Sequence, residues 1–261
     1  MFDTHTHLHE ETFQEDREEI LEELRARDIR GILVGTDMDT SRQGIDLARQ
    51  SAPFWSAVGI HPHEAQEVSV SRVENEIRPL LAEDVVVGVG ECGLDYARDL
   101  TDTAKENQKN LFQAHLRLAH ETEYPVIIHT RDAWEDTYDL LKEVKQHPLI
   151  LHCFTGDAAW ANRFLTDFPH LYVSFSGIVT FKKNVQDIQS AARLVPPERM
   201  LAETDAPYLA PEPYRGKRND TRTIYRVIQT LANLKGMSFE QLDQILDANA
   251  REVFGLGPEE E

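Results

Sequence analysis

The sequence is poor in cysteine and in long apolar runs, and each shortage excludes a class of protein. It contains only two cysteines, which excludes a disulfide-rich secreted scaffold. No apolar run approaches the length that spans a membrane, and the first strand-like run leaves no room before it for a signal peptide. We therefore expect a cytoplasmic protein with no membrane association and no obligate protein partner.

Positive charge is also scarce. The chain has 27 lysines and arginines against 46 aspartates and glutamates, for a formal net charge of −19. Such an acidic surface repels a polyanion at long range, so a nucleic-acid substrate would need a local basic patch or bound cations. The 261 residues are 41% hydrophobic and contain no linker, low-complexity tract or internal repeat. This composition predicts one domain over residues 1–261.

Short apolar runs alternate with longer amphipathic segments along the whole chain. The runs of strand length lie at 1–5, 31–36, 53–60, 85–91, 125–130, 149–154, 171–177 and 199–205. Strand and helix repeated about eight times over roughly 250 residues is typical of an α/β fold, the (β/α)₈ barrel. An open doubly wound sheet would share the alternation, but its glycine-rich first turn is missing.

Alternating histidines close the first of these runs, in "DTHTHLH". Residues two apart on a strand point the same way, so His5 and His7 project together from the strand end. Two imidazoles so placed form a chelating pair. In isolation the pair would more often be two histidines on one polar strand face.

Four more ionisable residues end apolar runs elsewhere in the chain. Glu91 ends "VVVGVGE", His129 lies in "PVIIHT", His152 lies in "LILHCF", and Asp205 ends "RMLAETD". The carboxyl ends of barrel strands converge on the catalytic face, so we expect these side chains to meet His5 and His7 there. A buried cluster of histidines and carboxylates without lysine or arginine would be unfavourable unless cations were present. The pattern therefore predicts a divalent-metal site.

The motifs also resemble those of the TatD family of metal-dependent hydrolases over nearly the whole chain. The matching stretches are "DTHTHL", "GIHPHEA", "GECGLDY", "PVIIHTRDAWED", "LHCFTG", "SFSGIVTFKK", "LAETDAPYLAP" and "PYRGKRN". The resemblance implies the same barrel and metal-dependent hydrolysis of DNA phosphodiesters, often from the 3′ end. It implies two divalent cations that share Glu91. The implied ligands are His5, His7, Glu91 and Asp205 for one cation, and Glu91, His129 and His152 for the other.

The resemblance implies magnesium, although this nitrogen and oxygen ligand set also suits manganese, zinc, iron or nickel. Two close cations can lower the pKa of a water and polarise a phosphoryl group, which leaves the protein to accept a proton and position the substrate. We expect Asp205 to accept that proton, and we assign Asp205 and Glu91 as the catalytic residues.

Basic residues gather after the last run, which places them on the catalytic rim of a barrel. They are Arg215, Lys217, Arg218, Arg222 and Arg226. The last two could equally pair with acidic neighbours at a helix start. We expect substrate contacts from Arg215, Lys217, Arg218 and Lys182, with Tyr208 available for base stacking. The resemblance places His63, in "HPH", on the substrate side as well. The predicted partner is DNA, entering as single-stranded ends.

Two departures from the family pattern concern substrate preference more than chemistry. The family usually has aspartate or asparagine where this chain has His9, which we expect to lie toward solvent in a loop or to face the substrate, and not to be a required ligand. The family commonly continues "RGKRN" with Glu-Pro, where this chain has Asp220 and Thr221.

Two other functions stay open from the sequence. A small-molecule amidohydrolase or esterase could use the same metals, because the fold alone does not select a substrate. A metal-binding protein without hydrolytic activity is the third reading, although such a module does not require two metals and a free carboxylate.

Overall fold

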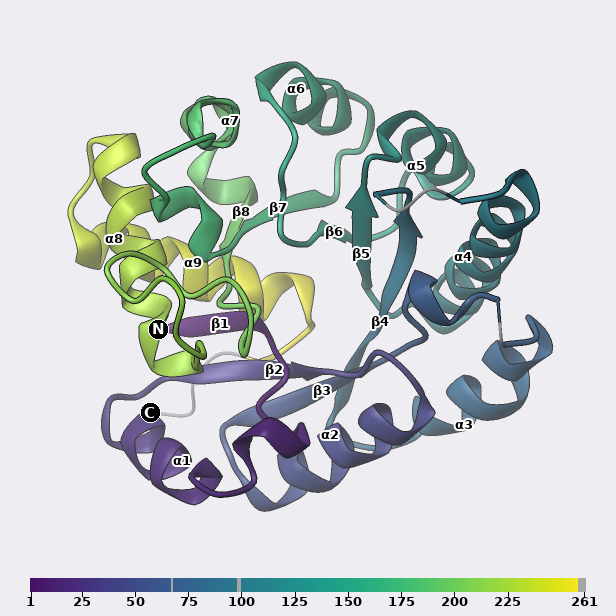
Figure 1. Ribbon diagram of the computed structural model, residues 1–261, viewed down its shortest axis with the longest axis horizontal. Helices are drawn as coiled ribbons and strands as arrows, with labels where there is room; N and C mark the ends of the chain where they lie inside the picture. Colours follow the sequence, from purple (N-terminus) through teal and green to yellow (C-terminus); the bar gives the residue numbers. More distant parts are fainter. Residues whose placement is uncertain (67, 98–99, 258–261) are drawn as a thin grey trace.

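Eight parallel strands follow one another around the sheet in chain order in the computed structural model, which describes residues 1–66, 68–97 and 100–257 (Figure 1). The strands are β1 (Phe2–Thr6), β2 (Arg30–Val34), β3 (Phe54–Val58), β4 (Val86–Asp95), β5 (Val126–Arg131), β6 (Leu149–Leu151), β7 (Leu171–Phe175) and β8 (Met200–Ala202). Each pairs in parallel with the next, as expected when a helix or loop carries the chain back between strands.

The first and last strands meet and close the barrel. Thr6 and Ala206 form a parallel bridge, the His7 amide donates to the Ala206 carbonyl at 2.8 Å, and the Asp205 amide donates to the His5 carbonyl at 2.9 Å. The (β/α)₈ barrel is therefore confirmed, and the open doubly wound sheet is excluded. The closing bonds lie at the carboxyl ends of both strands, so they bring His5 and His7 beside Asp205.

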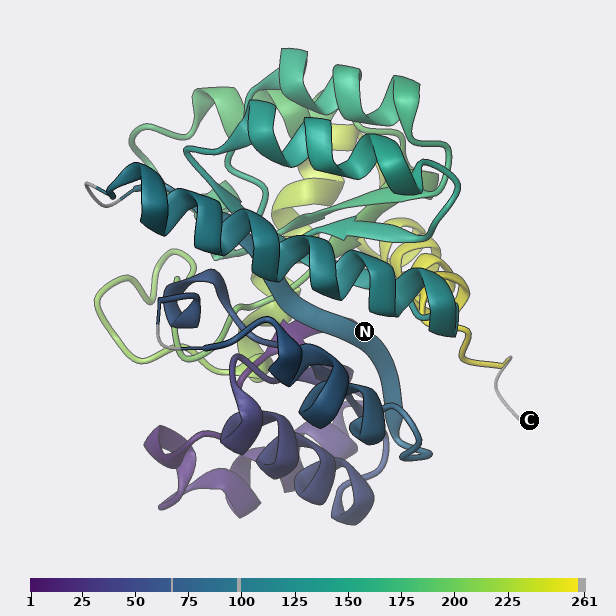
Figure 2. The same cartoon turned by 90° about the vertical axis from the view of Figure 1, so that its right-hand side faces the viewer.

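Helices surround the barrel on its outside. They are α1 (Arg17–Ala26), α2 (Met38–Gln50), α3 (Arg78–Leu80), α4 (Asp102–Thr122), α5 (Trp134–Leu141), α6 (Ala158–Asp167), α7 (Gln186–Leu194), α8 (Ile224–Lys235) and α9 (Phe239–Val253). Figure 2 shows α4 running the length of the barrel wall. None of the helices described is long and apolar enough to cross a membrane.

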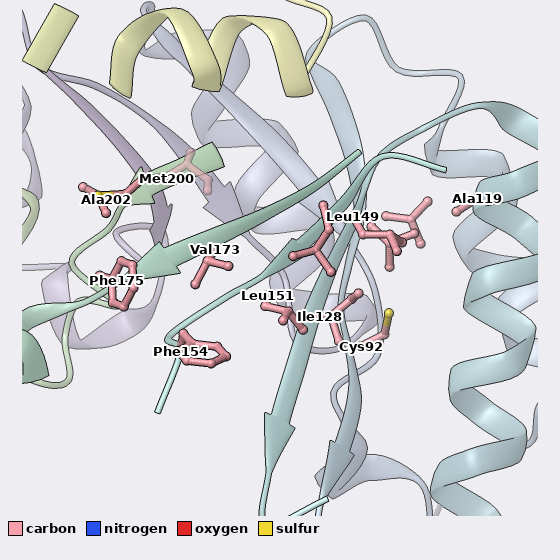
Figure 3. Packing of buried hydrophobic residues seen from close by; sticks show 14 of the residues in the cluster. Cys92, Ala119, Ile128, Leu149, Leu151, Phe154, Val173, Phe175, Met200 and Ala202 are labelled. Carbon is pink, nitrogen blue, oxygen red and sulfur yellow. The ribbon is translucent and has the colours of Figure 1, made fainter. Parts of the chain in front are cut away.

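Strand alternation separates two apolar layers. Cys92, Ile128, Leu151 and Val173 are register partners across β4 to β7 and pack in the layer between the strands and the helices (Figure 3). The residues one position earlier on β5, β6 and β7 point the other way and pack inside the barrel: Ile127, Ile150 and Tyr172. Because Cys92 faces the helices, its neighbour Glu91 is free to face the interior.

The strand ends differ from the predicted ones where the site begins. β4 continues to Asp95, four positions past the expected end at Glu91. Its Gly93 lies so close to β5 that a Cβ there would be 2.0 Å from the His129 carbonyl oxygen, and its φ of 143° suits glycine alone. β6 and β8 end early, before His152 and Asp205. Asp205 has a left-handed φ of 54°, which interrupts the extended strand and turns the chain at the barrel mouth.

Candidate metal centre

Three of the residues predicted as ligands form one group at the junction of β1 and β8. The His5 Nε2 and His7 Nε2 atoms lie 3.3 Å apart, and His7 Nε2 lies 3.5 Å from Asp205 Oδ1. The His7 ring is oriented by a hydrogen bond of 2.7 Å between its Nδ1 and the Val34 carbonyl oxygen, with Nδ1–H as the donor. That bond leaves the His7 Nε2 lone pair facing the group.

The other predicted ligands form a second group around Glu91. Glu91 Oε1 lies 2.8 Å from His129 Nδ1 and 2.9 Å from His152 Nε2. Its other oxygen, Oε2, lies 3.3 Å from His5 Nε2. Glu91 thus has one oxygen toward each group, which fits the shared carboxylate that the family resemblance implied.

The donor set fits divalent cations. His5, His7 and Asp205 offer ligand atoms within 4.8 Å of one another, and so do His61, Glu91 and His129. A third group with the same property is formed by His5, His152 and Glu203. Within residues 1–66, 68–97 and 100–257, no lysine or arginine forms an ion pair with Glu91 or Asp205. Glu91 is buried and Asp205 is partly buried, and because their ion-pair partners are all imidazoles they require positive charge from protons or from metal.

In the metal-free chain, protons supply that charge. Burial opposes ionisation of Glu91, but the charges of His152 and His61 and the hydrogen bonds from His129 and His152 hold the pKa of Glu91 well below its usual range. Burial likewise opposes the charged form of His7, but the hydrogen bond and charge of Asp205 raise the pKa of His7 to about 9. Cations that bind here would displace these protons, so their affinity should fall as the pH is lowered.

Three neighbours of these ligands were not singled out from the sequence. His61 Nε2 lies 3.6 Å from Glu91 Oε1. Asp95 Oδ2 lies 3.3 Å from His129 Nε2, and the buried Glu203 Oε1 lies 3.1 Å from His152 Nδ1. Asp95 is four positions after Glu91, so it would have been placed on the same strand face had β4 been expected to continue. Nothing in the sequence pattern distinguished Glu203 from an ordinary strand-end acid.

The expectation that His9 lies toward solvent is wrong. Its side chain is buried, with 3% of the residue exposed, and neither ring nitrogen has a hydrogen-bond partner in the structure. The chain turns after His7, and Arg17 on α1 donates hydrogen bonds to the carbonyls of Leu8, His9 and Glu10, which holds this turn against the barrel. His9 lies outside the three metal-competent groups of the described residues.

The predicted basic residues of the rim are in different situations. Arg218 is paired with Asp16, and Arg222 is paired with Asp220 and Glu23. The Arg215 guanidinium lies 3.7 Å from the centroid of the Phe181 ring and is exposed. Lys217 is exposed, and the Lys182 side chain is 81% exposed with its ammonium 3.9 Å from Glu212. Arg215, Lys217 and Lys182 therefore offer the most accessible positive charge of the predicted set.

Two further predicted positions lie at the mouth of the site. His63 Nε2 lies 2.9 Å from Asp95 Oδ2, with about a third of its side chain exposed. Tyr208 is 54% exposed, and its ring centroid lies 6.1 Å from that of His7.

Asp220 and Thr221, which differ from the family pattern after "RGKRN", anchor the basic loop. Asp220 caps a short turn by accepting the Arg222 amide at 3.0 Å, and the buried Thr221 hydroxyl donates to Thr6 Oγ1 at 2.9 Å. The loop is thus fastened to the end of β1, next to the histidine pair.

Comparison with known proteins gives consistent matches along the chain. The sequence model of the family described as TatD related DNase matches residues 2–255. The chain is 37% identical over 259 residues to the uncharacterized metal-dependent hydrolase YabD of Bacillus subtilis, covering 98% of this chain and 99% of that one. It is 35% identical over 264 residues to the 3′-5′ ssDNA/RNA exonuclease TatD of Erwinia amylovora, covering 98% and 100%. The crystal structure of YJJV, a TatD homologue from Escherichia coli, superposes with a TM-score of 0.89 at 26% identity and covers 98% of both chains.

Proposed function

The chain belongs to the family of TatD related DNases and is a metal-dependent hydrolase, and from this premise we propose that it cleaves DNA phosphodiesters from the 3′ ends of single strands. The observation that carries the proposal is the position of Glu91 between two groups of imidazole nitrogens, with Asp205 beside one of them. We assign His5, His7, Glu91 and Asp205 to one cation and Glu91, His129 and His152 to a second, with magnesium as the expected metal.

Cations held by these residues would lower the pKa of the attacking water and polarise the phosphoryl group. The protein then has to remove a proton from that water. Asp205 is suited to this task by its position, because its Oδ1 lies 3.5 Å from His7 Nε2 and 3.9 Å from His5 Nε2. A carboxylate beside the proposed ligands can orient the attacking water and accept its proton.

The exposed positive charges on the rim favour a polyanionic substrate that contacts the protein through only a few phosphates. Arg215, Lys217 and Lys182 present exposed positive charge on an otherwise acidic molecule. The exposed ring of Tyr208 offers a stacking surface for an unpaired base next to the reacting phosphate. A base in a duplex is already stacked, so this surface favours single-stranded ends.

The test is digestion of 5′-labelled single-stranded DNA by the purified protein without metal and with magnesium, manganese or zinc. We expect products shortened stepwise from the 3′ end with metal only, and little digestion of a blunt duplex. Asp205→Asn serves as the matched control for a contaminating nuclease.

A small-molecule amidohydrolase or esterase remains the second candidate, since the same metals would serve it. A panel of amides and simple esters is assayed under identical conditions. Cleavage of an amide with no digestion of DNA under any metal would replace the nuclease proposal.

A further inference from the structure

His129 and His152 each place one ring nitrogen on Glu91 and the other on a different carboxylate. His152 turns Nε2 toward Glu91 Oε1, at 2.9 Å, and Nδ1 toward Glu203 Oε1, at 3.1 Å. His129 does the reverse: its Nδ1 lies 2.8 Å from Glu91 Oε1, and its Nε2 lies 3.3 Å from Asp95 Oδ2. The two rings therefore offer opposite nitrogens to the proposed metal centre.

This opposition requires opposite tautomers. A neutral imidazole carries a single N–H, and only the other nitrogen has a lone pair for a metal. An ionised carboxylate has no proton to give, so an imidazole that hydrogen-bonds to it must be the donor. In the metal-free chain both nitrogens of each ring face a carboxylate. Once a cation takes the nitrogen that faces Glu91, the single remaining proton must lie on His152 Nδ1, toward Glu203, and on His129 Nε2, toward Asp95.

Glu203 is itself held firmly. It is fully buried, its Oε1 also accepts the Cys153 amide at 2.6 Å, and its Oε2 accepts the Ser174 hydroxyl at 2.6 Å. The Cys153 contact comes from the residue that follows His152, so one oxygen fixes both the backbone and the ring of the proposed ligand. Asp95 is shared between two histidines, because His63 Nε2 lies closer to the same Asp95 oxygen than His129 Nε2 does, at 2.9 Å.

We propose that Glu203 and Asp95 are positioning residues that hold His152 and His129 in opposite tautomers, with Glu203 having the larger effect. The inference rests on the proposed metal site and assigns neither carboxylate as a ligand. Carboxylates behind metal-bound histidines orient the ring and raise its basicity. In this chain, Glu203 and Asp95 would direct two different ring nitrogens, His152 Nε2 and His129 Nδ1, toward the same proposed metal centre.

Zinc binding to the metal-free protein, measured by calorimetry, tests the proposal without any assay of activity. Zinc suits this nitrogen and oxygen donor set and is diamagnetic. Glu203→Ala should keep the wild-type number of zinc ions and lower the affinity of the weakened site by roughly 10- to 100-fold. Glu203→Gln keeps an oxygen that can accept His152 Nδ1–H, so its loss should be smaller. Asp95→Asn should have a smaller effect than Glu203→Ala.

Asp3→Asn is the matched control. Asp3 is as buried as Glu203 and accepts the Thr204 amide and hydroxyl and, at 3.3 Å, the His5 amide, but among the described residues it hydrogen-bonds to no imidazole nitrogen. Asparagine keeps the oxygen that accepts both amides. Its replacement should leave the zinc affinity unchanged even where the folded state becomes less stable.

Nitrogen-15 spectra of zinc-loaded wild-type protein give a readout that needs no carboxylate variant. His152, assigned by its loss in His152→Gln, should carry its proton on Nδ1, and His129, assigned by its loss in His129→Gln, should carry its proton on Nε2. The proposal fails if either ring shows the other tautomer, if Glu203→Ala binds zinc like the wild type, or if that variant loses a whole zinc equivalent, which would make Glu203 a ligand. Absence of zinc binding by the wild type would instead remove the proposed metal site and this inference with it.

Discussion

The two ends of the barrel are built from the same eight strands but bury opposite kinds of side chain. At the amino end, the interior is filled by an apolar cluster. Its members are Phe2, Ile32, Val34, Ala57, Val87, Ile127, Ile150, Tyr172 and Leu201, with Ala250, Val253 and Phe254 from α9 and the turn after it. At the carboxyl end, the interior holds imidazoles and carboxylates whose partners are one another. At the end of β8 the change is abrupt: Leu201, in the strand, belongs to the first set, and Glu203, the residue after the strand, belongs to the second.

The contrast separates stability from chemistry. Apolar side chains at the amino end stabilise the fold because their burial removes apolar surface from water, and this burial requires no hydrogen-bond partners. The polar cluster at the carboxyl end is unfavourable to bury until cations or protons balance it. The amino end should therefore tolerate little change in volume, and the carboxyl end little change in charge or donor type.

The largest expected effect comes from a substitution in the apolar cluster at the amino end alone. Leu201→Ala removes a fully buried side chain from the apolar cluster and should lower the free energy of unfolding by about 2–5 kcal/mol. Urea denaturation measures the loss, and zinc calorimetry on the folded variant should give wild-type stoichiometry. A wild-type denaturation midpoint would show that the amino end does not carry the stability assigned to it.

Asp205→Asn breaks the carboxyl end without changing its size. The variant keeps one oxygen donor but loses the proton acceptor, so turnover at saturating metal should fall by roughly 10²-fold or more. Rates on DNA and urea denaturation of the metal-free variant are compared with the wild type. Turnover equal to the wild type at saturating metal would rule out Asp205 as the base.

His9 is a polar residue buried at the carboxyl end, and its ring nitrogens have no hydrogen-bond partner among the described residues, so it sharpens the comparison. Replacing a buried unsatisfied group by an apolar one of similar size removes its desolvation cost, so His9→Leu should raise the free energy of unfolding by about 1 kcal/mol or more. His9→Asn should leave the metal stoichiometry intact. Loss of a metal equivalent in elemental analysis of either variant would make His9 part of the centre after all.

The smallest expected effect concerns the rim. With few exposed cations, DNA affinity should fall gently with salt, with a log–log slope of roughly −1 to −3 at about −0.7 per contacted phosphate. Arg215→Ala with Lys217→Ala should flatten this slope, whereas Arg218→Ala should change it less because Arg218 is already paired with Asp16. Hydrolysis of a small activated phosphodiester is the control and should be nearly unchanged. An unaltered slope in the double variant would show that other residues make the phosphate contacts.

Much of the site followed from local pattern. Five of the six residues predicted as ligands lie near or just beyond a strand end, and Glu91 lies four positions before the end of β4. The structure brings all six together, while their role as ligands stays a prediction. The expectation that failed involves a tertiary contact. His9 keeps the strand parity of His5 and His7, but the turn held by Arg17 buries it. Arg218 lies beside Asp16, a pairing that the sequence did not indicate, and its contact with substrate stays a prediction.

The order of strands and helices and the residue types near the strand ends could be predicted from the sequence, because period-two alternation and apolar runs are local properties of the chain. Tertiary structure decided which nitrogen of each histidine faces Glu91, and which carboxylate receives the other. Glu203 and His152 are separated by 51 positions, and Asp95 and His129 by 34. Only closure of the barrel sets those distances, and a ring with two chemically similar nitrogens has no preference until a partner lies on one side.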